Sequence, residues 1–231
     1  MGKKITVDLY FVQMKWVAWY LPIVYIAYFA LVWFLHEPEI QSMSLLTFTF
    51  QTATIFMLVC GILSSTVFLP VFVKQGVSRK SYFQGAIFSS ICLTITIIGI
   101  TAILSWILSL FEINMFKDVV LSSLGANSWL LTIITYFLSV MIYYLVGWLI
   151  GTSFYRYSGS GGFMSIVASL IIISLNDLLW EFSTPKPLMG LLNINTPTPH
   201  IGFALIGSIA IAVISTMFVH KIVKDTPIKV A

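Results

Sequence analysis

A short basic stretch, PVFVKQGVSRKSYFQG at residues 70–85, separates two long apolar runs and carries three cations: Lys74, Arg79 and Lys80. Each would cost roughly 2.5–3.5 kcal/mol at the centre of a membrane helix. Gly76 and Ser78 favour a turn, and Ser78 also suits the N-cap of the helix that follows. We therefore expect a turn that lies in water or among lipid headgroups.

Residue types that commonly carry catalysis are present, but their pattern does not indicate an active site. His36, His200 and His220 fall at the ends of apolar runs on different sides, which does not suit a metal cluster. The SGSGG stretch around Ser160 does not match G-x-S-x-G, and the sequence contains no G-x-x-x-x-G-K-[ST] phosphate loop. We expect no catalytic residue, no metal and no directly bound cofactor.

Asp177 is the one carboxylate, lysine or arginine that falls inside the apolar segments predicted below to span the membrane. Together with Glu181, four residues later, it is expected to be a solvated group at the outer end of a helix rather than a cation site. Carriers driven by protons or sodium usually hold ionisable groups near mid-membrane. We therefore do not expect this chain alone to couple transport to an ion gradient.

The composition indicates an integral membrane protein. Of the 231 residues, 59% are hydrophobic and 9% are charged, whereas about a quarter of residues are charged in soluble domains. Cys60 and Cys92 lie inside apolar runs, where small packed side chains are a better interpretation than a disulfide. We expect a single transmembrane domain over residues 1–231 and no soluble domain.

A hydrocarbon core of about 30 Å needs about 20 apolar residues of helix. This length predicts six spans, at residues 16–35, 45–69, 84–110, 129–152, 163–178 and 201–219, of which residues 163–178 form a short one.

The segments that flank these spans carry their own patterns. Residues 3–15 gather Lys4, Asp8 and Lys15 in one sector of a helix, which favours a separate interfacial helix; an extension of the first span is the alternative. The glycine-rich SFYRYSGSGG predicts a turn, and the proline-rich residues 179–200 predict an outer connection with interfacial or re-entrant helices.

Polar and small residues inside the spans indicate contacts between helices. Thr47, Gln51 and Thr54 lie in one half of the second span, where they either form interhelical hydrogen bonds or line a substrate path. Small residues recur at helical spacing in two further spans, as Gly147 with Gly151 and as Ala204 with Ser208 and Ala212. Such rows allow helix backbones to approach closely.

The basic residues fall mainly on one side of the predicted spans. Ten of the twelve lie there: Lys3, Lys4, Lys15, Lys74, Arg79, Lys80, Arg156, Lys221, Lys224 and Lys229. The other side keeps Lys117 and Lys186 together with six of the eight acidic residues. By the positive-inside rule, both termini and the turn at residues 70–85 are expected in the cytoplasm. The sequence thus predicts an all-α, multi-pass protein of a cell membrane.

This arrangement resembles the permease subunit of a bacterial type-2 ATP-binding-cassette (ABC) transporter. Six spans, a preceding interfacial helix, cytoplasmic termini and the loop GVSRKSYFQG carry the resemblance, because that loop is similar to the family's coupling loop. The outer connection at residues 179–200 also resembles the family's re-entrant helices. The small size is similar to exporters of peptides such as lantibiotics or amphipathic toxins.

The resemblance implies that residues 71–83 couple the chain to a separate ATPase subunit, which would bind ATP and Mg²⁺. The docking residues would be Lys74, Gln75, Gly76, Val77, Ser78, Arg79, Lys80, Tyr82 and Phe83. Within this set Tyr82 and Phe83 would form an apolar anchor, and Arg156 with Tyr157 would add a second cytoplasmic contact.

The resemblance also implies a dimer with a second permease copy or a paralogue, for which the rows of small residues are candidate interfaces. The substrate would be hydrophobic or amphipathic, with a peptide or toxin favoured, and would leave the cell. Membrane lipid is the other expected partner, and no nucleic acid is expected.

The residues alone leave other interpretations open. One is a non-exporting membrane partner, such as the membrane subunit of an uptake system or an immunity protein. A small membrane enzyme acting on lipid is disfavoured because no acid–base cluster is present, and a secondary carrier because mid-membrane charges are missing. For residues 70–85 the alternative is an ordinary loop whose charges only set the topology.

Overall fold

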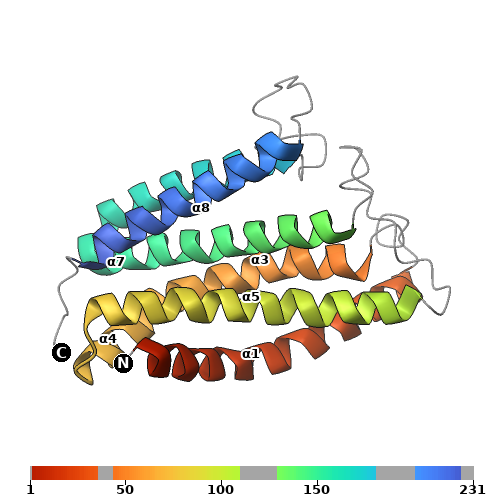
Figure 1. Ribbon diagram of the computed structural model, residues 1–231, viewed down its shortest axis with the longest axis horizontal. Helices are drawn as coiled ribbons and strands as arrows, with labels where there is room; N and C mark the ends of the chain where they lie inside the picture. The colour runs from red at the N-terminus through yellow and green to blue at the C-terminus, as the bar shows by residue number, and fades with distance from the viewer. Residues whose placement is uncertain (1, 36–43, 110–128, 181–200, 225–231) are drawn as a thin grey trace.

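The computed structural model describes residues 2–35, 44–109, 129–180 and 201–224. Outside Ser44 and the turn at residues 75–78, every one of these residues is helical. The elements in chain order are α1 (Gly2–Ala30), η1 (Leu31–Leu35), α3 (Leu45–Leu63), η2 (Ser64–Phe68), α4 (Leu69–Lys74), α5 (Arg79–Ser109), α7 (Trp129–Trp180) and α8 (Ile201–Lys224). Together they form an elongated helical bundle (Figure 1).

Six helical stretches of the described residues are long and apolar enough to cross a membrane: Lys4–Phe34, Leu45–Lys74, Arg79–Leu108, Trp129–Tyr157, Gly159–Trp180 and Ile201–Lys224. The predicted all-α class and the predicted number of spans are therefore confirmed. Several of these stretches extend beyond the predicted bounds, because the helices continue past the apolar runs that defined the spans.

Helix α1 is continuous from Gly2 to Ala30, so the separate interfacial helix predicted for residues 3–15 is not supported. The cause lies in its apolar face. Ile5 and Leu9 are buried, and α1 packs along α5. The charged sector that suggested a membrane surface is the outward side of a longer packed helix.

The second membrane-length helix is built from α3, η2 and α4. Ser44 caps its start, because the Ser44 hydroxyl accepts a hydrogen bond of 3.1 Å from the Thr47 amide. Pro70 does not end this span, because the helix continues to Lys74. The π-helical turn η2 ends two residues before Pro70 and includes Thr66, the residue whose carbonyl the proline ring would meet in a regular α-helix.

Helix α7 contains 52 residues but turns back on itself. The Asn176 amide donates a hydrogen bond of 3.2 Å to Ser139 Oγ, 37 residues away. A straight helix of that length would separate the two residues by about 55 Å. The reversal falls between the stretches Trp129–Tyr157 and Gly159–Trp180, inside the glycine-rich segment where the sequence predicts a turn.

The first half of α7 lies at the centre of the bundle, and its side chains are the most buried of the six stretches. Helix α7 packs against α3 and α8, while α1 and α5 pair on the other side of α3 (Figure 1). Glycines set the closest approach: a Cβ on Gly147 would overlap the Leu58 carbonyl, and a Cβ on Gly61 would overlap the Tyr144 carbonyl.

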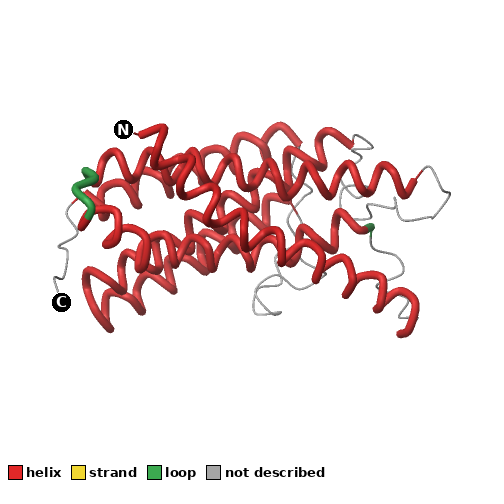
Figure 2. Tube along the Cα trace, turned by 90° about the horizontal axis from the view of Figure 1, so that it is seen from below, coloured by secondary structure: helices red, strands yellow, loops and turns green. Residues whose placement is uncertain are grey.

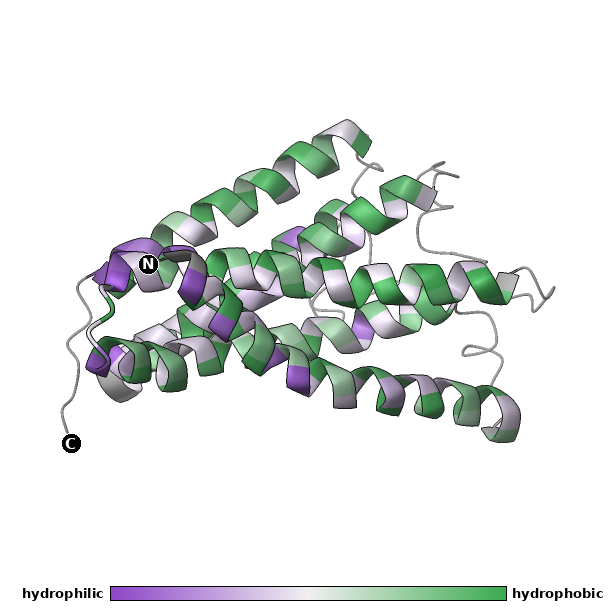
Figure 3. Ribbon diagram, turned by 60° about the horizontal axis from the view of Figure 1, so that its bottom comes forward, coloured by the Kyte–Doolittle hydropathy of each residue, from purple (hydrophilic) through white to green (hydrophobic). Residues whose placement is uncertain are grey.

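The outer surface of the bundle is largely apolar. Large side chains are exposed along its length, among them Trp19, Ile26, Phe34, Met164 and Ile206. Figure 3 shows hydrophobic ribbon over most of every helix and hydrophilic ribbon concentrated at one end. Such a surface suits lipid rather than water, so we describe the chain as a multi-pass membrane protein.

Apart from Lys15 on α1, the cations whose side chains are described belong to the elements that meet at that end, which we call the basic end: Lys4, Lys74, Arg79, Lys80, Arg156, Lys221 and Lys224. The start of α1, the turn between α4 and α5, the reversal of α7 and the end of α8 all lie there (Figures 1 and 2). Arg79 Nη1 donates to the Lys224 carbonyl at 2.9 Å, and Arg156 Nη1 donates to the Ile222 carbonyl at 3.2 Å. These two bonds cap the last turn of α8, where cations also oppose the helix dipole.

Candidate functional site

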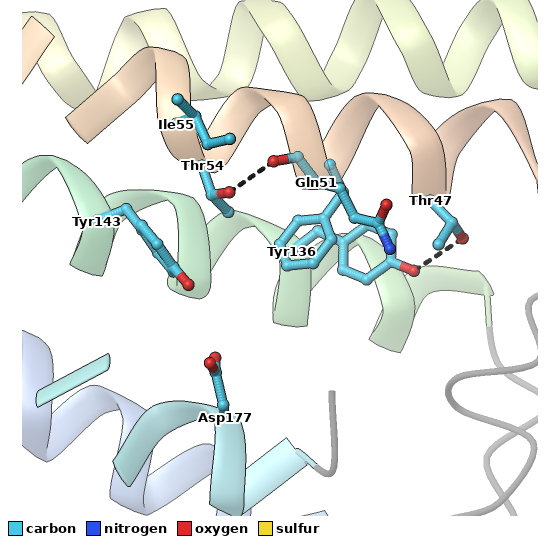
Figure 4. Close-up of a pocket in the computed structure, with 8 residues that line it drawn as sticks. Thr47, Gln51, Thr54, Ile55, Tyr136, Tyr143 and Asp177 are labelled. Atoms are coloured by element: carbon cyan, nitrogen blue, oxygen red, sulfur yellow. Dashed lines mark hydrogen bonds between the residues drawn. The ribbon is translucent and has the colours of Figure 1, made fainter. Parts of the chain in front are cut away.

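A cavity of about 310 Å³ opens among the membrane-length helices, between α3 and the two halves of α7 (Figure 4). Its lining consists of Thr47, Phe50, Gln51, Thr54, Ile55, Tyr136, Tyr143 and Asp177. The three residues that the sequence proposed for a substrate path all belong to this lining. Whether a substrate passes along them stays a prediction.

The α3 wall of the cavity follows from helical spacing. Thr47, Gln51 and Thr54 are separated by four and three residues, so they lie on one face of the helix. Thr47 and Thr54 are buried, whereas the Gln51 side chain is exposed and borders the cavity. Thr54 Oγ1 donates to the Gln51 backbone carbonyl at 2.7 Å, so this bond does not involve the Gln51 side-chain amide.

Aromatic rings form a second part of the lining. The rings of Phe50 and Tyr136 stack with centroids 4.1 Å apart and planes inclined by 10°. The Tyr136 hydroxyl shares a hydrogen bond of 3.0 Å with Thr47 Oγ1. The Tyr136 ring is therefore fixed by stacking on Phe50 and by this hydrogen bond. Tyr143 comes from the same half of α7, two turns further along (Figure 4).

Asp177 faces α3 from the second half of α7, and its carboxyl group points into the cavity (Figure 4). It is half-buried and is the one charged residue of the lining. The sequence suggested a solvated group at a helix end instead. The difference lies in the packing, because the end of the second half of α7 lies opposite α3, a pairing that the sequence did not indicate.

A chain of buried hydrogen bonds fixes the backbone next to Asp177. The Asn176 amide donates to Ser139 Oγ, Ser208 Oγ donates to Asn176 Oδ1 at 3.2 Å, and Trp180 Nε1 donates to Ser208 Oγ at 2.6 Å. These bonds join the two halves of α7 to α8. The position of Asp177 is thus set by three helical stretches.

The sequence did not identify Phe50, Ile55, Tyr136, Tyr143 or Asp177 as parts of one site. One signal was available, because Tyr136 and Tyr143 are seven residues apart and therefore share a helix face. Nothing in the sequence indicated that this face lies opposite the threonines of α3.

A second polar cluster lies between α1, η2, α5 and α7. Gln13 Nε2 donates to Ser64 Oγ at 3.3 Å, and Ser89 Oγ donates to Gln13 Oε1 at 3.3 Å. Ser64 Oγ also shares a hydrogen bond of 2.9 Å with the Tyr144 hydroxyl. These side chains are buried and bonded to one another, so the cluster holds helices together and presents no open surface.

The turn between α4 and α5 contains the predicted turn chemistry. Gly76 has a φ of 84°, its amide donates to the Val73 carbonyl at 2.9 Å, and the Val77 amide donates to the Phe72 carbonyl at 3.1 Å. This pair of bonds is the Schellman ending of a helix, for which glycine is favoured because it adopts positive φ without strain. Ser78 Oγ then accepts from the Ser81 amide at 3.2 Å and caps α5.

Residues 71–83 do not form a helix of their own. They comprise the end of α4, the turn, and the first residues of α5. Val71, Lys74, Gln75, Gly76, Ser78 and Lys80 are exposed, while Val77 and Arg79 are half-buried.

Tyr82 and Phe83 cannot form the apolar anchor that was expected to enter a separate ATPase subunit, so this prediction is wrong. Tyr82 is fully buried, and its hydroxyl donates to the Ser64 carbonyl at 2.5 Å. Phe83 is 8% exposed and packs against Trp148 and His220. The period of α5 places both rings on the side that faces the bundle.

The two rows of small residues are used inside the chain. Gly147 and Gly151 contact α3 and η2, where a Cβ on either glycine would overlap Leu58 or Ser65. Ala204 and Ser208 are buried against the second half of α7, and Ala212 is half-buried. These rows therefore act in packing within one chain, and their predicted use as a dimer interface is not supported.

Arg156 and Tyr157 lie at the reversal of α7. The guanidinium carbon of Arg156 is 4.9 Å from the centre of the Tyr157 ring, and the ring is exposed. Their predicted contact with a partner subunit stays a prediction.

No family model, curated protein or solved structure matches the chain. Within the part of the chain that the structure describes, no group of three or more His, Cys, Asp or Glu side chains could hold a metal ion.

Proposed function

We propose that this chain is a membrane permease subunit, which holds an amphipathic ligand in the cavity and passes it across the membrane with energy from a separate ATPase subunit. The cavity is the observation that supports the proposal. Polar groups that serve only packing bond to one another, as they do around Ser64. Gln51 and Asp177 instead border open space between apolar helices.

The cavity suits a small amphipathic ligand or one portion of a larger one. Its volume of about 310 Å³ lies at the lower end of the range of ligand sites, about 300–1,000 Å³. The lining combines aromatic rings and Ile55 with hydroxyl, amide and carboxyl groups. A peptide that places one or two side chains in the cavity satisfies both features, so peptide or toxin export is the favoured form of the proposal.

The energy source is assigned to a partner because the sequence contains no phosphate loop. The basic end offers a docking surface of exposed side chains around the turn, including Lys74 and Lys80. By the positive-inside rule this end faces the cytoplasm of a cell, where ATP is present. A second permease copy would pack through a face other than the two rows of small residues.

The test is co-purification of the full chain with an ATPase encoded beside it, using the double variant Lys74→Glu with Lys80→Glu. We expect normal membrane insertion and at least tenfold less bound ATPase, because the charge of the docking surface is reversed. Lys15→Glu is the matched control, since Lys15 is also exposed but lies away from the turn on α1. Arg79→Glu is less suitable because Arg79 also caps α8.

Full ATPase binding by the double variant would rule out docking at the turn. Failure of the unaltered chain to associate with any such ATPase would overturn the proposed function as a whole.

A further inference from the structure

We propose that the cavity recognises the positively charged group of its ligand, an organic ammonium, with Asp177 as the counter-ion and aromatic rings as the walls. The inference rests on the proposed function for the role of the cavity and adds the chemical class of the ligand. Four features of the described residues support it: the charge of the lining, its rings, its acceptor atoms and its volume.

The cavity lining carries a negative charge and no positive one. Asp177 is the one charged residue of the lining, and no described lysine or arginine forms an ion pair with it. The described cations lie at the basic end, apart from Lys15 on α1. A carboxylate between membrane helices is unfavourable unless a positive charge or several donors accompany it. A cationic ligand supplies the positive charge that no described lysine or arginine places beside Asp177.

The rings and acceptors suit an ammonium group. Aromatic faces attract cations through their quadrupole, and Phe50, Tyr136 and Tyr143 all contribute to the lining. An alkylammonium has N–H donors and no acceptor, so its binding site must provide hydrogen-bond acceptors. The Asp177 carboxylate and the Gln51 side-chain carbonyl supply two of them on opposite walls of the cavity (Figure 4).

The volume and the donor set favour an organic cation over an inorganic one. A metal ion such as Ca²⁺ takes six to eight oxygen ligands at about 2.3–2.6 Å. The lining offers one carboxylate in a space of about 310 Å³, much of it bordered by rings. An ammonium group carrying an apolar substituent fills such a space, whereas a bare ion leaves most of it empty.

The experiment uses the full chain in nanodiscs of zwitterionic phosphatidylcholine, without an ATPase. Three soluble probes share one ring and differ in charge: benzylammonium, benzyl alcohol and benzenesulfonate. Equilibrium dialysis with labelled probes measures their binding. We expect saturable binding of the cation, at least tenfold tighter than binding of the neutral or anionic probe.

Variants locate the binding site. Asp177→Asn should weaken binding of the cation at least tenfold, whereas Asp177→Glu should retain most of it because the charge remains. Asp8→Asn is the matched control, since Asp8 is the other acidic residue of the described chain and is exposed on α1. Circular dichroism and gel filtration verify that each variant is folded.

Three results would overturn the inference: unchanged cation binding in Asp177→Asn, equal binding of benzyl alcohol, or displacement of the probe by sodium chloride as effectively as by methylammonium chloride. The last would assign the site to an inorganic cation. Because no ATPase takes part, loss of ATPase association with intact cation binding would count against the proposed function alone.

Discussion

Ser64 shows at the scale of single residues how this bundle uses polar groups. Its hydroxyl donates to the Cys60 carbonyl at 2.8 Å and also meets Gln13 and the Tyr144 hydroxyl. In lipid, apolar helix faces gain little from contacting each other rather than lipid chains. Buried hydrogen bonds of this kind therefore select which helices pair.

Removal of one hydroxyl from this cluster tests that role. We expect Tyr144→Phe to lower the free energy of unfolding by about 1 kcal/mol, because Ser64 loses a buried partner. Tyr157→Phe should have almost no effect, since Tyr157 is exposed and its ring remains beside Arg156. Unfolding in mixed dodecyl sulfate and maltoside micelles measures both. Equal stability of the two variants would show that the cluster contributes nothing.

At this scale the sequence predicts the role of a residue when that role depends on its neighbours in the chain. Gly76 and Ser78 form the predicted turn because positive φ and N-capping depend on near neighbours. Tyr82 and Phe83 were misassigned because their position beside charges suggested exposure. The side of α5 that they occupy is decided by α7 and α8, which lie far away in the sequence.

Helices α3 and α7 show at the scale of elements how glycines determine a contact. Gly61 on one helix and Gly147 on the other each meet a backbone carbonyl of the opposite helix. No larger residue fits at this distance. The crossing therefore depends on two small residues that lie far apart in the sequence.

Replacing glycine by alanine at a packed and at an open position distinguishes the effect of helix packing on stability from the effect of helix propensity. Gly147→Ala should destabilise the protein by about 1–3 kcal/mol, because its Cβ would force α3 and α7 apart. Gly99→Ala is the matched control within α5, where a Cβ would meet nothing within 4 Å. Alanine favours helix over glycine, so this control should be neutral or slightly stabilising. Thermal unfolding of detergent-purified protein distinguishes the two, and equal effects would contradict the proposed crossing.

Hydropathy predicted the number of spans and three of their starting residues, at 45, 129 and 201, because it measures how long an apolar run is. It did not show that α1 is one helix, since the burial of Ile5 and Leu9 depends on α5. Hydropathy also does not indicate which spans pack against each other. For that reason the threonines of α3 were noticed, while the tyrosines and the carboxylate opposite them were not.

The whole molecule has one basic end and one end without described cations, and this asymmetry predicts its orientation in the membrane. We expect a cysteine introduced as Lys74→Cys or Lys221→Cys to react with an impermeant maleimide only from the cytoplasmic side. Trp129→Cys, at the opposite end of the bundle, should react only from the other side. Alanine at Cys60 and Cys92 provides the background, and labelling of all three positions from one side would contradict this topology.

The two arginine caps on α8 have a mechanical consequence. Arg79 ties the start of α5 to the last turn of α8, and Arg156 ties the reversal of α7 to the same turn. Further along α8, Ser208 bonds to Asn176, the neighbour of Asp177. Because α8 is one continuous helix bonded at both places, we expect it to act as a rigid strut, so that a displacement of the basic turn would also shift Asn176 and the cavity wall beside it.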